Sequence, residues 1–264
     1  MSALTVHVEG LGVWSPTLAD IDALRAHRTG VPASAPAARP PAPRLPASER
    51  RRASASVLLA VEVAGQAVAM SGLDASTLPC VFASAYGDLA ITDYLCATLA
   101  HAPGELSPTR FHHSVHNAPA GYWTIATGCH AASSAICAGR ATVGAGLLEA
   151  ATLACTGQQP VLLVCSDIAG SGPLGGIVGC HHAFGGALVL SPQAGPRSLA
   201  RLALALVHAP STPFSLPIDC TGSMSDNPSA ALLPLLESLL DTTGDVTLAA
   251  AHGLALHAHV EPAA

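Results

Sequence analysis

The stretch Val161-Leu162-Leu163-Val164-Cys165 is an unbroken apolar run, and it decides the class of fold. A short run without a polar residue is typical of a strand that is buried on both of its faces. Such a strand needs helices on both sides of its sheet to cover it. The run therefore predicts an α/β fold in layers, with residues 161–165 in the buried sheet.

The segments on either side of this run alternate between strand and helix patterns, as a layered α/β fold requires. The strand that opens the chain reaches Gly10-Leu11-Gly12, which predicts a turn at its end. We expect one domain over residues 1–264, because a chain of this length can bury a sizeable core. Helices are predicted over residues 18–27, 48–72, 91–99, 117–126, 142–155 and 228–240, and strands over 4–14, 80–84, 187–190, 202–207, 246–250 and 254–260.

The longest predicted helix, residues 48–72, opens with Ser48, a residue type that caps helix N-termini. Its apolar residues recur at helical spacing. The preceding stretch, residues 31–47, is rich in proline and alanine. Proline lacks the backbone N–H that helices and strands use, so this stretch is predicted to be a surface loop.

Charge and composition exclude several classes of function. All 11 basic residues are arginine, so this chain supplies no lysine for a Schiff base or a phosphate-binding loop. The formal net charge is -6, whereas a nucleic-acid-binding protein needs a dense basic face. We therefore expect no binding to nucleic acid.

Neither membrane insertion nor export is predicted. The two most apolar windows, residues 53–73 and 141–165, are interrupted by polar residues such as Glu62 and Glu149. Neither window gives the roughly 18 to 20 uninterrupted apolar residues of a membrane span. The N-terminal residues lack the charged and apolar regions of a secretory signal. We expect a cytoplasmic protein whose 8 cysteines are free thiols.

Three segments, in this order, are similar to the β-ketoacyl synthases, the condensing enzymes of the thiolase fold. Residues 6–16 resemble the first strand and turn of that family. Residues Asn117-Ala118-Pro119-Ala120-Gly121 resemble its Asn-x-x-Ala-Gly helix start at the dimer interface, and residues 184–190 resemble its glycine-rich entry to a later strand. The resemblance implies a thiolase-like, layered αβα fold equivalent to the N-terminal half of a ketosynthase.

A narrower resemblance concerns residues 107–117, followed by Gly121-Tyr122-Trp123. These residues are similar to the short ketosynthase-like proteins of aryl polyene and xanthomonadin-type pigment clusters. Such proteins are regarded as chain-length-factor-like partners of a true ketosynthase. The resemblance implies a heterodimer with a catalytic ketosynthase subunit, or a homodimer, and an acyl carrier protein that is reached through the partner.

The obvious nucleophile candidate is Cys129, because ketosynthases hold their nucleophilic cysteine at the N-terminus of a helix. In the family that cysteine lies about 23 residues after the asparagine and about 21 before the next buried strand, since a strand and a helix must fit between them. Counting forward from Asn117 and back from Val161 both end at Arg140. In this register residues 133–137 form the strand that leads into the turn, and no catalytic nucleophile remains.

The resemblance also indicates what this sequence lacks. Ketosynthases use two histidines, and usually a lysine, from their C-terminal half to decarboxylate the extender unit. The sequence given is too short after residues 184–190 for a second such half, and His252-Gly253 is followed by Leu254 instead of the family's threonine. A complete condensing site within this chain is therefore not expected.

The segment that precedes the Asn-x-x-Ala-Gly helix carries several bulky side chains. In thiolase-fold dimers, residues at this place reach across the two-fold axis and line the acyl channel of the partner. There they would form a floor that limits the length of the acyl chain, or they would only fill the dimer interface. The acyl-channel and interface residues implied by the resemblance are Arg110, Phe111, His112, His113, His116 and Asn117.

Two further features have plain explanations. The 13 histidines include clusters at residues 112–116 and 180–182 and the pair His257 and His259, but none has the spacing of a zinc motif. We expect no metal and no other cofactor. Arg50-Arg51-Arg52 could dock an acidic carrier protein, although a charge run at a helix start is usually a solvated face.

Together these observations predict a non-catalytic ketosynthase-like subunit, a chain length factor, for polyene, polyketide or fatty-acid-type biosynthesis. The alternative is an active β-ketoacyl synthase or acyltransferase that uses Cys129 as nucleophile, with His130 or His116 as its base. A third possibility is a homodimer that binds an acyl chain or a carrier protein without chemistry.

Overall fold

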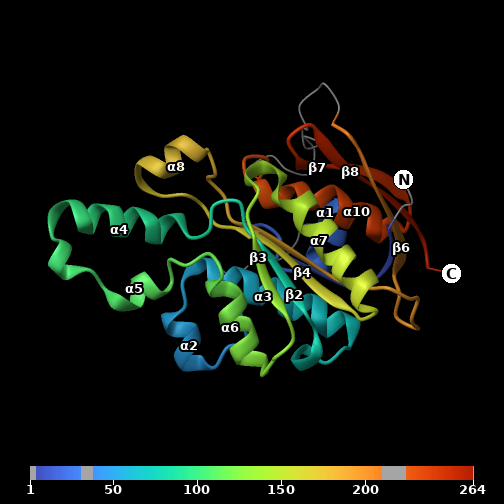
Figure 1. Cartoon of the computed structure of the whole chain (residues 1–264), viewed down its shortest axis with the longest axis horizontal. Helices are drawn as coiled ribbons and strands as arrows, with labels where there is room; N and C mark the ends of the chain where they lie inside the picture. Colours follow the sequence, from blue (N-terminus) through green and yellow to red (C-terminus); the bar gives the residue numbers. More distant parts are fainter. Residues whose placement is uncertain (1–3, 31–37, 210–223, 264) are drawn as a thin grey trace.

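The computed structural model describes residues 4–30, 38–209 and 224–263. Its centre is an eight-stranded sheet with the order β3-β2-β4-β5-β1-β6-β8-β7 (Figure 1). β4 runs parallel to β2, and β2 parallel to β3, whereas the pairs from β5 onwards are antiparallel. The strands are β1 (Leu4–Trp14), β2 (Cys80–Ala83), β3 (Ser133–Ile136), β4 (Val161–Asp167), β5 (Phe184–Ser191), β6 (Ala200–His208), β7 (Gly244–Ala251) and β8 (Leu254–Pro262).

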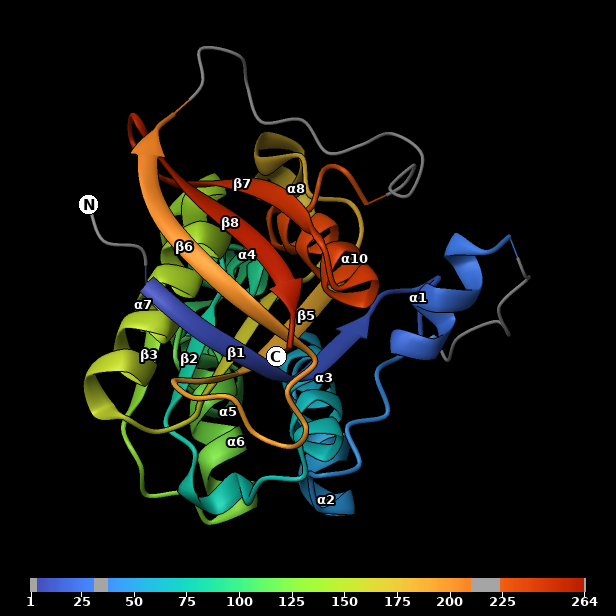
Figure 2. The same ribbon diagram turned by 90° about the vertical axis from the view of Figure 1, so that its right-hand side faces the viewer.

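Helices cover both faces of this sheet. α3 and α6 pack on one face, and α7, η4 and α10 on the other, as Figures 1 and 2 show. The α-helices are α1 (Ile21–Arg28), α2 (Ala47–Arg52), α3 (Ala55–Ser71), α4 (Leu89–His101), α5 (Pro108–His112), α6 (Ala118–Thr127), α7 (Thr142–Gly157), α8 (Gly172–Val178) and α10 (Leu233–Asp241). Short 3-10 helices are η1 (Ala75–Thr77), η2 (Pro103–Glu105), η3 (Gly139–Ala141) and η4 (Pro228–Leu232).

β4 confirms the prediction made from its apolar run. Every residue of β4 is buried. Leu163 and Cys165 belong to the core between the sheet and α7, and Leu162 and Val164 belong to the core on the α3 side. Because successive side chains of a strand point to opposite faces, an unbroken apolar run is what two cores require.

The strand predicted over residues 4–14 is confirmed as β1, but the turn predicted from Gly10-Leu11-Gly12 is wrong, because both glycines lie within the strand. A Cβ at Gly10 would stand 2.0 Å from the carbonyl oxygen of Ala67, and one at Gly12 would stand 2.2 Å from that of Val63. Both carbonyls belong to α3. The glycines therefore allow the backbone of α3 to approach β1, a role that glycine plays where two backbones come close.

The prediction of one helix over residues 48–72 is also wrong, because the chain breaks it into α2 and α3. Ala53 and Ser54 between them are extended, with ψ of 142° and 166°. The hydroxyl of Ser54 accepts a hydrogen bond from the N–H of Val57 at 3.4 Å, so Ser54, not Ser48, caps the long helix. A capping serine offers the backbone an alternative to continuing the helix.

Three other segments differ from their predictions. Residues 228–240 form η4 and α10 instead of one helix, and the sequence patterns predicted neither α5 nor α8. Within the predicted surface loop 31–47, residues 38–46 form no helix or strand and residue 47 begins α2, whereas residues 31–37 lie outside the described residues.

α4, α5 and α8 project from the ends of β2 and β4, to the left in Figure 1. α4 contacts both α5 and α8. The two edge strands of the sheet are β3 and β7. The residues singled out from the sequence lie between α5 and the start of α7, on or beside α5, α6, β3 and η3.

Candidate functional site

Arg140 lies in the turn between β3 and α7. It belongs to η3, four residues after the last residue of β3 and two before the first of α7. Its side chain is exposed, and within the described part of the chain it makes no hydrogen bond or ion pair. The prediction of a strand at residues 133–137 followed by a helix is confirmed, with β3 ending at Ile136.

Cys129 lies before β3, just after α6 ends at the left-handed residue Gly128. Its backbone N–H donates to the carbonyl of Thr124 at 2.9 Å, and its thiol to that of Leu78 at 3.4 Å. Its side chain is buried, with 6% exposed. The C-terminal end of a helix carries partial negative charge, so this position lacks the helix N-terminus that stabilises a thiolate.

The other cysteines are mostly packing residues. Burial raises the pKa of Cys80 and Cys180 to about 12 and raises that of Cys165 further, so these thiols stay protonated near neutral pH. Cys137 is exposed in the turn before Arg140, and its thiol donates to the carbonyl of Ala85 at 3.2 Å. No sequence pattern singles out Cys137.

The segment of residues 107–117, which we call the interface segment, begins with side chains that face solvent. The guanidinium of Arg110 stacks over the ring of Tyr94, 4.0 Å from its centroid. Phe111 is 58% exposed and His112 is exposed as well. An apolar ring that is left open to this degree is available to a partner.

His113 differs from its neighbours, because it is buried with 4% exposed. Its Nε2 lies 2.6 Å from the hydroxyl of Tyr122 on α6. Burial lowers the pKa of His113, and the neighbouring His112 lowers it too, whereas the carboxylates of Asp88 and Glu49 act in the opposite direction. His113 therefore holds the interface segment on α6 and is not at the surface.

His116 and Asn117 end the interface segment. Nε2 of His116 lies 2.9 Å from the carbonyl oxygen of Ser84 and must donate, since a carbonyl only accepts. Asn117 precedes α6, but its side chain makes no capping hydrogen bond and is exposed.

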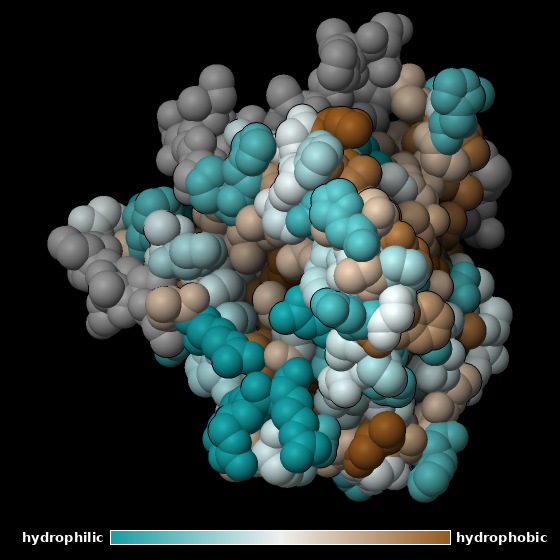
Figure 3. Space-filling view, turned by 90° about the vertical axis from the view of Figure 1, so that its left-hand side faces the viewer, coloured by the Kyte–Doolittle hydropathy of each residue, from teal (hydrophilic) through white to brown (hydrophobic). Residues whose placement is uncertain are grey.

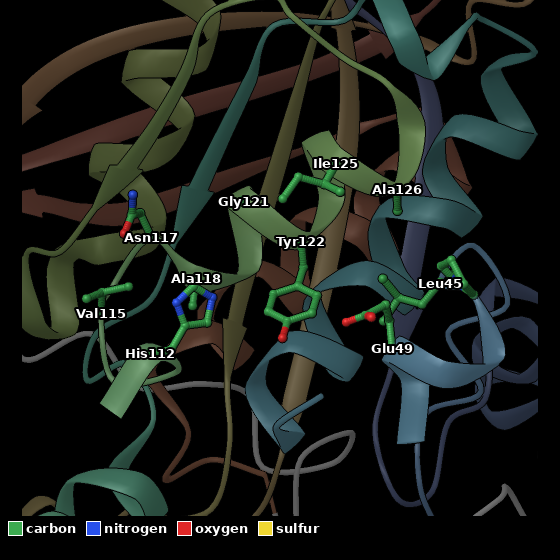
Figure 4. A pocket seen from close by; sticks show the side chains of 11 residues that line it. Leu45, Glu49, His112, Val115, Asn117, Ala118, Gly121, Tyr122, Ile125 and Ala126 are labelled. Atoms are coloured by element: carbon green, nitrogen blue, oxygen red, sulfur yellow. The ribbon is translucent and has the colours of Figure 1, made fainter. Parts of the chain in front are cut away.

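A hollow of about 410 Å³ lies between α2 and α6, and we call it the α6 hollow. Its walls are mainly apolar, and its volume is in the range of small-molecule pockets. Figure 4 shows Tyr122 at its centre, with Leu45 and Glu49 on one side and His112, Val115 and Asn117 on the other. The hollow thus connects the interface segment with the outer face of α6.

The outer face of α6 is open to solvent. Ile125 is 85% exposed, and one turn earlier a Cβ at Gly121 would meet no atom of the described residues within 4 Å. Packing within the chain therefore does not explain a glycine in this helix, where it costs about 1 kcal/mol relative to alanine. The face of the molecule in Figure 3 carries separate apolar patches among polar residues.

β3 presents a second open surface. It pairs with β2 alone, and within residues 4–30, 38–209 and 224–263 no strand bonds to its other edge. The hydroxyl of Ser134 on this strand is buried without a hydrogen-bond partner. An edge strand with free N–H and C=O groups is a template for pairing with another chain.

Asp167, at the end of β4, is a buried acceptor that the sequence patterns did not reveal. Its Oδ1 accepts from the hydroxyl of Ser84 at 2.8 Å and from the N–H groups of Ala85 at 2.9 Å and Tyr86 at 3.2 Å. Its Oδ2 accepts from the hydroxyl of Ser229 at 2.6 Å. Burial raises the pKa of Asp167, whereas these hydrogen bonds act in the opposite direction.

The pKa of His113 leads to a prediction about pH. Because folding lowers this pKa below its unfolded value of about 6.5, the unfolded chain binds a proton that the folded chain does not. The contribution of His113 to the stability of the folded chain is therefore complete above that pH. It decreases as the pH is lowered, by at most about tenfold in the folding equilibrium constant per pH unit. We expect His113→Gln to lose less stability than the wild type between pH 7.5 and 5.5 in urea unfolding. His252→Gln, at an exposed turn, should keep the wild-type dependence; equal dependence in all three would contradict this role of His113.

Neither a metal site nor a membrane-spanning helix is found in the part of the chain that is described. There, no three His, Cys, Asp or Glu side chains are arranged to hold a metal ion. None of the described helices is long and apolar enough to cross a membrane.

Comparisons with known proteins agree with this architecture. A model of the beta-ketoacyl synthase N-terminal domain matches residues 25–250. No curated protein matches the chain. Among solved structures, a chain of the ketosynthase ApeO in complex with its chain length factor ApeC, from Xenorhabdus doucetiae, is 24% identical with a TM-score of 0.73, over 97% of this chain and 99% of that one.

Two other solved structures are similar over much of the chain. The ishigamide ketosynthase/chain length factor is 14% identical with a TM-score of 0.68, over 98% of this chain and 100% of that one. A type II polyketide ketosynthase in complex with its acyl-carrier protein, AntDE:AntF, is 16% identical with a TM-score of 0.63, over 79% and 70%. The predicted thiolase-like, layered α/β fold is confirmed, and the chain belongs to the β-ketoacyl synthase N-terminal domain family.

Proposed function

We propose that this chain is a non-catalytic chain length factor that pairs with a catalytic β-ketoacyl-ACP synthase in polyene, polyketide or fatty-acid-type biosynthesis. The observation that carries the proposal is the location of Arg140. It precedes α7, at the position where both spacing counts from the family end. A guanidinium stays protonated and has no usable lone pair, so it cannot attack a thioester.

Cys129 offers no substitute for the missing nucleophile. It lies in a different loop, buried at the end of α6, and its thiol bonds to a backbone carbonyl. His116, a candidate base for it, donates its Nε2–H to Ser84 and thus cannot accept a proton at that atom. A buried thiol without access to solvent is a packing residue.

The surface proposed to meet the partner consists of the free edge of β3, the outer face of α6 and the interface segment. Ile125 is an apolar side chain left open to water, and Gly121 leaves room for close approach of another backbone. Interfaces between subunits bury such apolar groups at their centre. Pairing of two edge strands would also satisfy the free N–H and C=O groups of β3.

In such a pair, the interface segment forms the end of the acyl channel of the partner. Arg110, Phe111 and His112 expose bulky side chains there. They would stop the acyl chain, and their size would set how long it grows. The acyl carrier protein would deliver its substrate to the ketosynthase subunit and not to this chain.

The experiment is co-expression with the ketosynthase and the acyl carrier protein of the same biosynthetic cluster. We expect the two ketosynthase-like chains to elute together in equal amounts. After incubation with an acyl-carrier thioester, mass spectrometry should find the acyl group on the ketosynthase and none on Cys129. An adduct on Cys129 would instead indicate an enzyme, and a homodimer that excludes the ketosynthase would contradict the pairing.

A further inference from the structure

His116 lies at the joint between the exposed part of the interface segment and α6. Its Nε2–H donates to the carbonyl oxygen of Ser84 at 2.9 Å. Its ring also lies beside Gly87, where a Cβ would stand 3.6 Å from its Cδ2. The ring thus joins the interface segment to the turn of residues 84–88, which is distant in the sequence.

The carbonyl that His116 binds is held rigidly. The hydroxyl of Ser84 donates to buried Asp167 and accepts from the N–H of Gly87 at 2.9 Å, while the N–H of Ser84 donates to Ile136 on β3 at 3.1 Å. The turn is therefore tied to the ends of both β3 and β4. A hydrogen bond to such a fixed acceptor restrains the group that makes it.

The interface segment makes few other contacts that fix it to the rest of the chain. α5 is only 5 residues long, and a single helical turn is unstable on its own. The N–H of Ser107 donates to the hydroxyl of Tyr94 at 3.3 Å, Arg110 stacks on the same ring, and His113 bonds to Tyr122. Tyr94 belongs to the projecting helix α4 and Tyr122 to α6. Of these contacts, that of His116 alone reaches the ends of the sheet strands.

We propose that His116 is a positioning residue that latches the interface segment onto the turn of residues 84–88, so that it is preformed for the ketosynthase partner. This proposal rests on the proposed function for its partner, whereas the latch itself belongs to this chain alone. Preordering a segment before binding lowers the entropy cost of association. Loss of the latch should therefore weaken binding, because the interface segment would then have to be ordered during association.

The test compares His116→Ala, which removes the donor, with His116→Gln, whose amide N–H can reach the same carbonyl. His252→Ala, on the exposed turn between β7 and β8, is the control. We expect His116→Ala to weaken binding to the ketosynthase roughly 5- to 10-fold, the value of one hydrogen bond. We expect His116→Gln to retain most of the wild-type affinity for the ketosynthase, and His252→Ala to bind like the wild type.

Hydrogen exchange of the isolated chain is the second readout. Amides of residues 107–117 should exchange faster in His116→Ala, with the midpoint of thermal unfolding nearly unchanged. If His116→Ala does not fold, His116→Phe keeps a ring without the donor and is used in its place. Unchanged exchange in these variants would overturn the latch, whether or not binding weakens. Failure of the wild-type chain to bind the ketosynthase would contradict the proposed function and leave the exchange result to decide the latch.

Discussion

Replacing Ile125 with glutamate is expected to abolish pairing with the ketosynthase subunit while the chain stays folded. Ile125 is 85% exposed on α6, and an exposed surface substitution usually changes stability by about 0.5 kcal/mol or less. At the centre of an interface the same carboxylate would be buried without a partner. That costs about 2 to 5 kcal/mol, or at least roughly 30-fold in Kd.

The measurement is co-elution of the two chains, with Kd from titration of the labelled variant. Leu254→Glu is the matched control, because Leu254 is 38% exposed but begins β8, beside the opposite edge of the sheet. It should bind like the wild type. Equal binding of Ile125→Glu and wild type would place the contact elsewhere than on α6, and equal loss in both variants would point to a general effect of added charge.

Asp167→Ala is expected to lower the free energy of unfolding by roughly 3 to 5 kcal/mol, because it leaves several buried donors without an acceptor. The carboxylate accepts four hydrogen bonds, from Ser84, Ala85, Tyr86 and Ser229. It joins the turn of residues 84–88 to the start of η4, at the ends of β2 and β4. No other described acceptor is bonded to these four groups, so nothing compensates for its loss.

Urea unfolding measures this effect, with two comparisons. Asp167→Asn keeps one oxygen as acceptor and should lose less than Asp167→Ala. Asp22→Ala removes an exposed ion pair with Arg25 on α1, which is worth well under about 1 kcal/mol. A loss for Asp167→Ala no larger than that for Asp22→Ala would show that the hydrogen bonds around Asp167 are replaced by water.

Much of the fold follows from local patterns in the sequence. The apolar run of residues 161–165 predicts a strand between two cores, and β4 lies between two cores because alternate side chains enter each. The break at Ala53 and Ser54 escapes the pattern because the apolar spacing lies wholly within α3 and does not show where that helix begins. Gly10 and Gly12 predict a turn from sequence alone, since the actual reason for both glycines, the approach of α3, lies more than 50 residues away.

The candidate site was predictable only in part. Counting between two recognisable points gave Arg140, and the turn between β3 and α7 contains it. His112 is exposed and His113 is buried, although the two look alike in the sequence. α5 is too short to show a periodicity from which this difference could be predicted. Asp167 escapes sequence patterns because its donors lie 62 to 83 residues away from it in the sequence, and no local pattern records such a contact.

The strand order has a consequence for how this protein is made. β1 precedes every other described strand in the chain, but its neighbours in the sheet are β5 and β6, so that His7 pairs with Ser191 on one side and Arg201 on the other. Pairings between residues so distant in the chain form slowly, because a long loop must close first. β1 must therefore wait without its neighbouring strands until about 180 further residues have been synthesised. During that time an apolar strand is open to wrong partners.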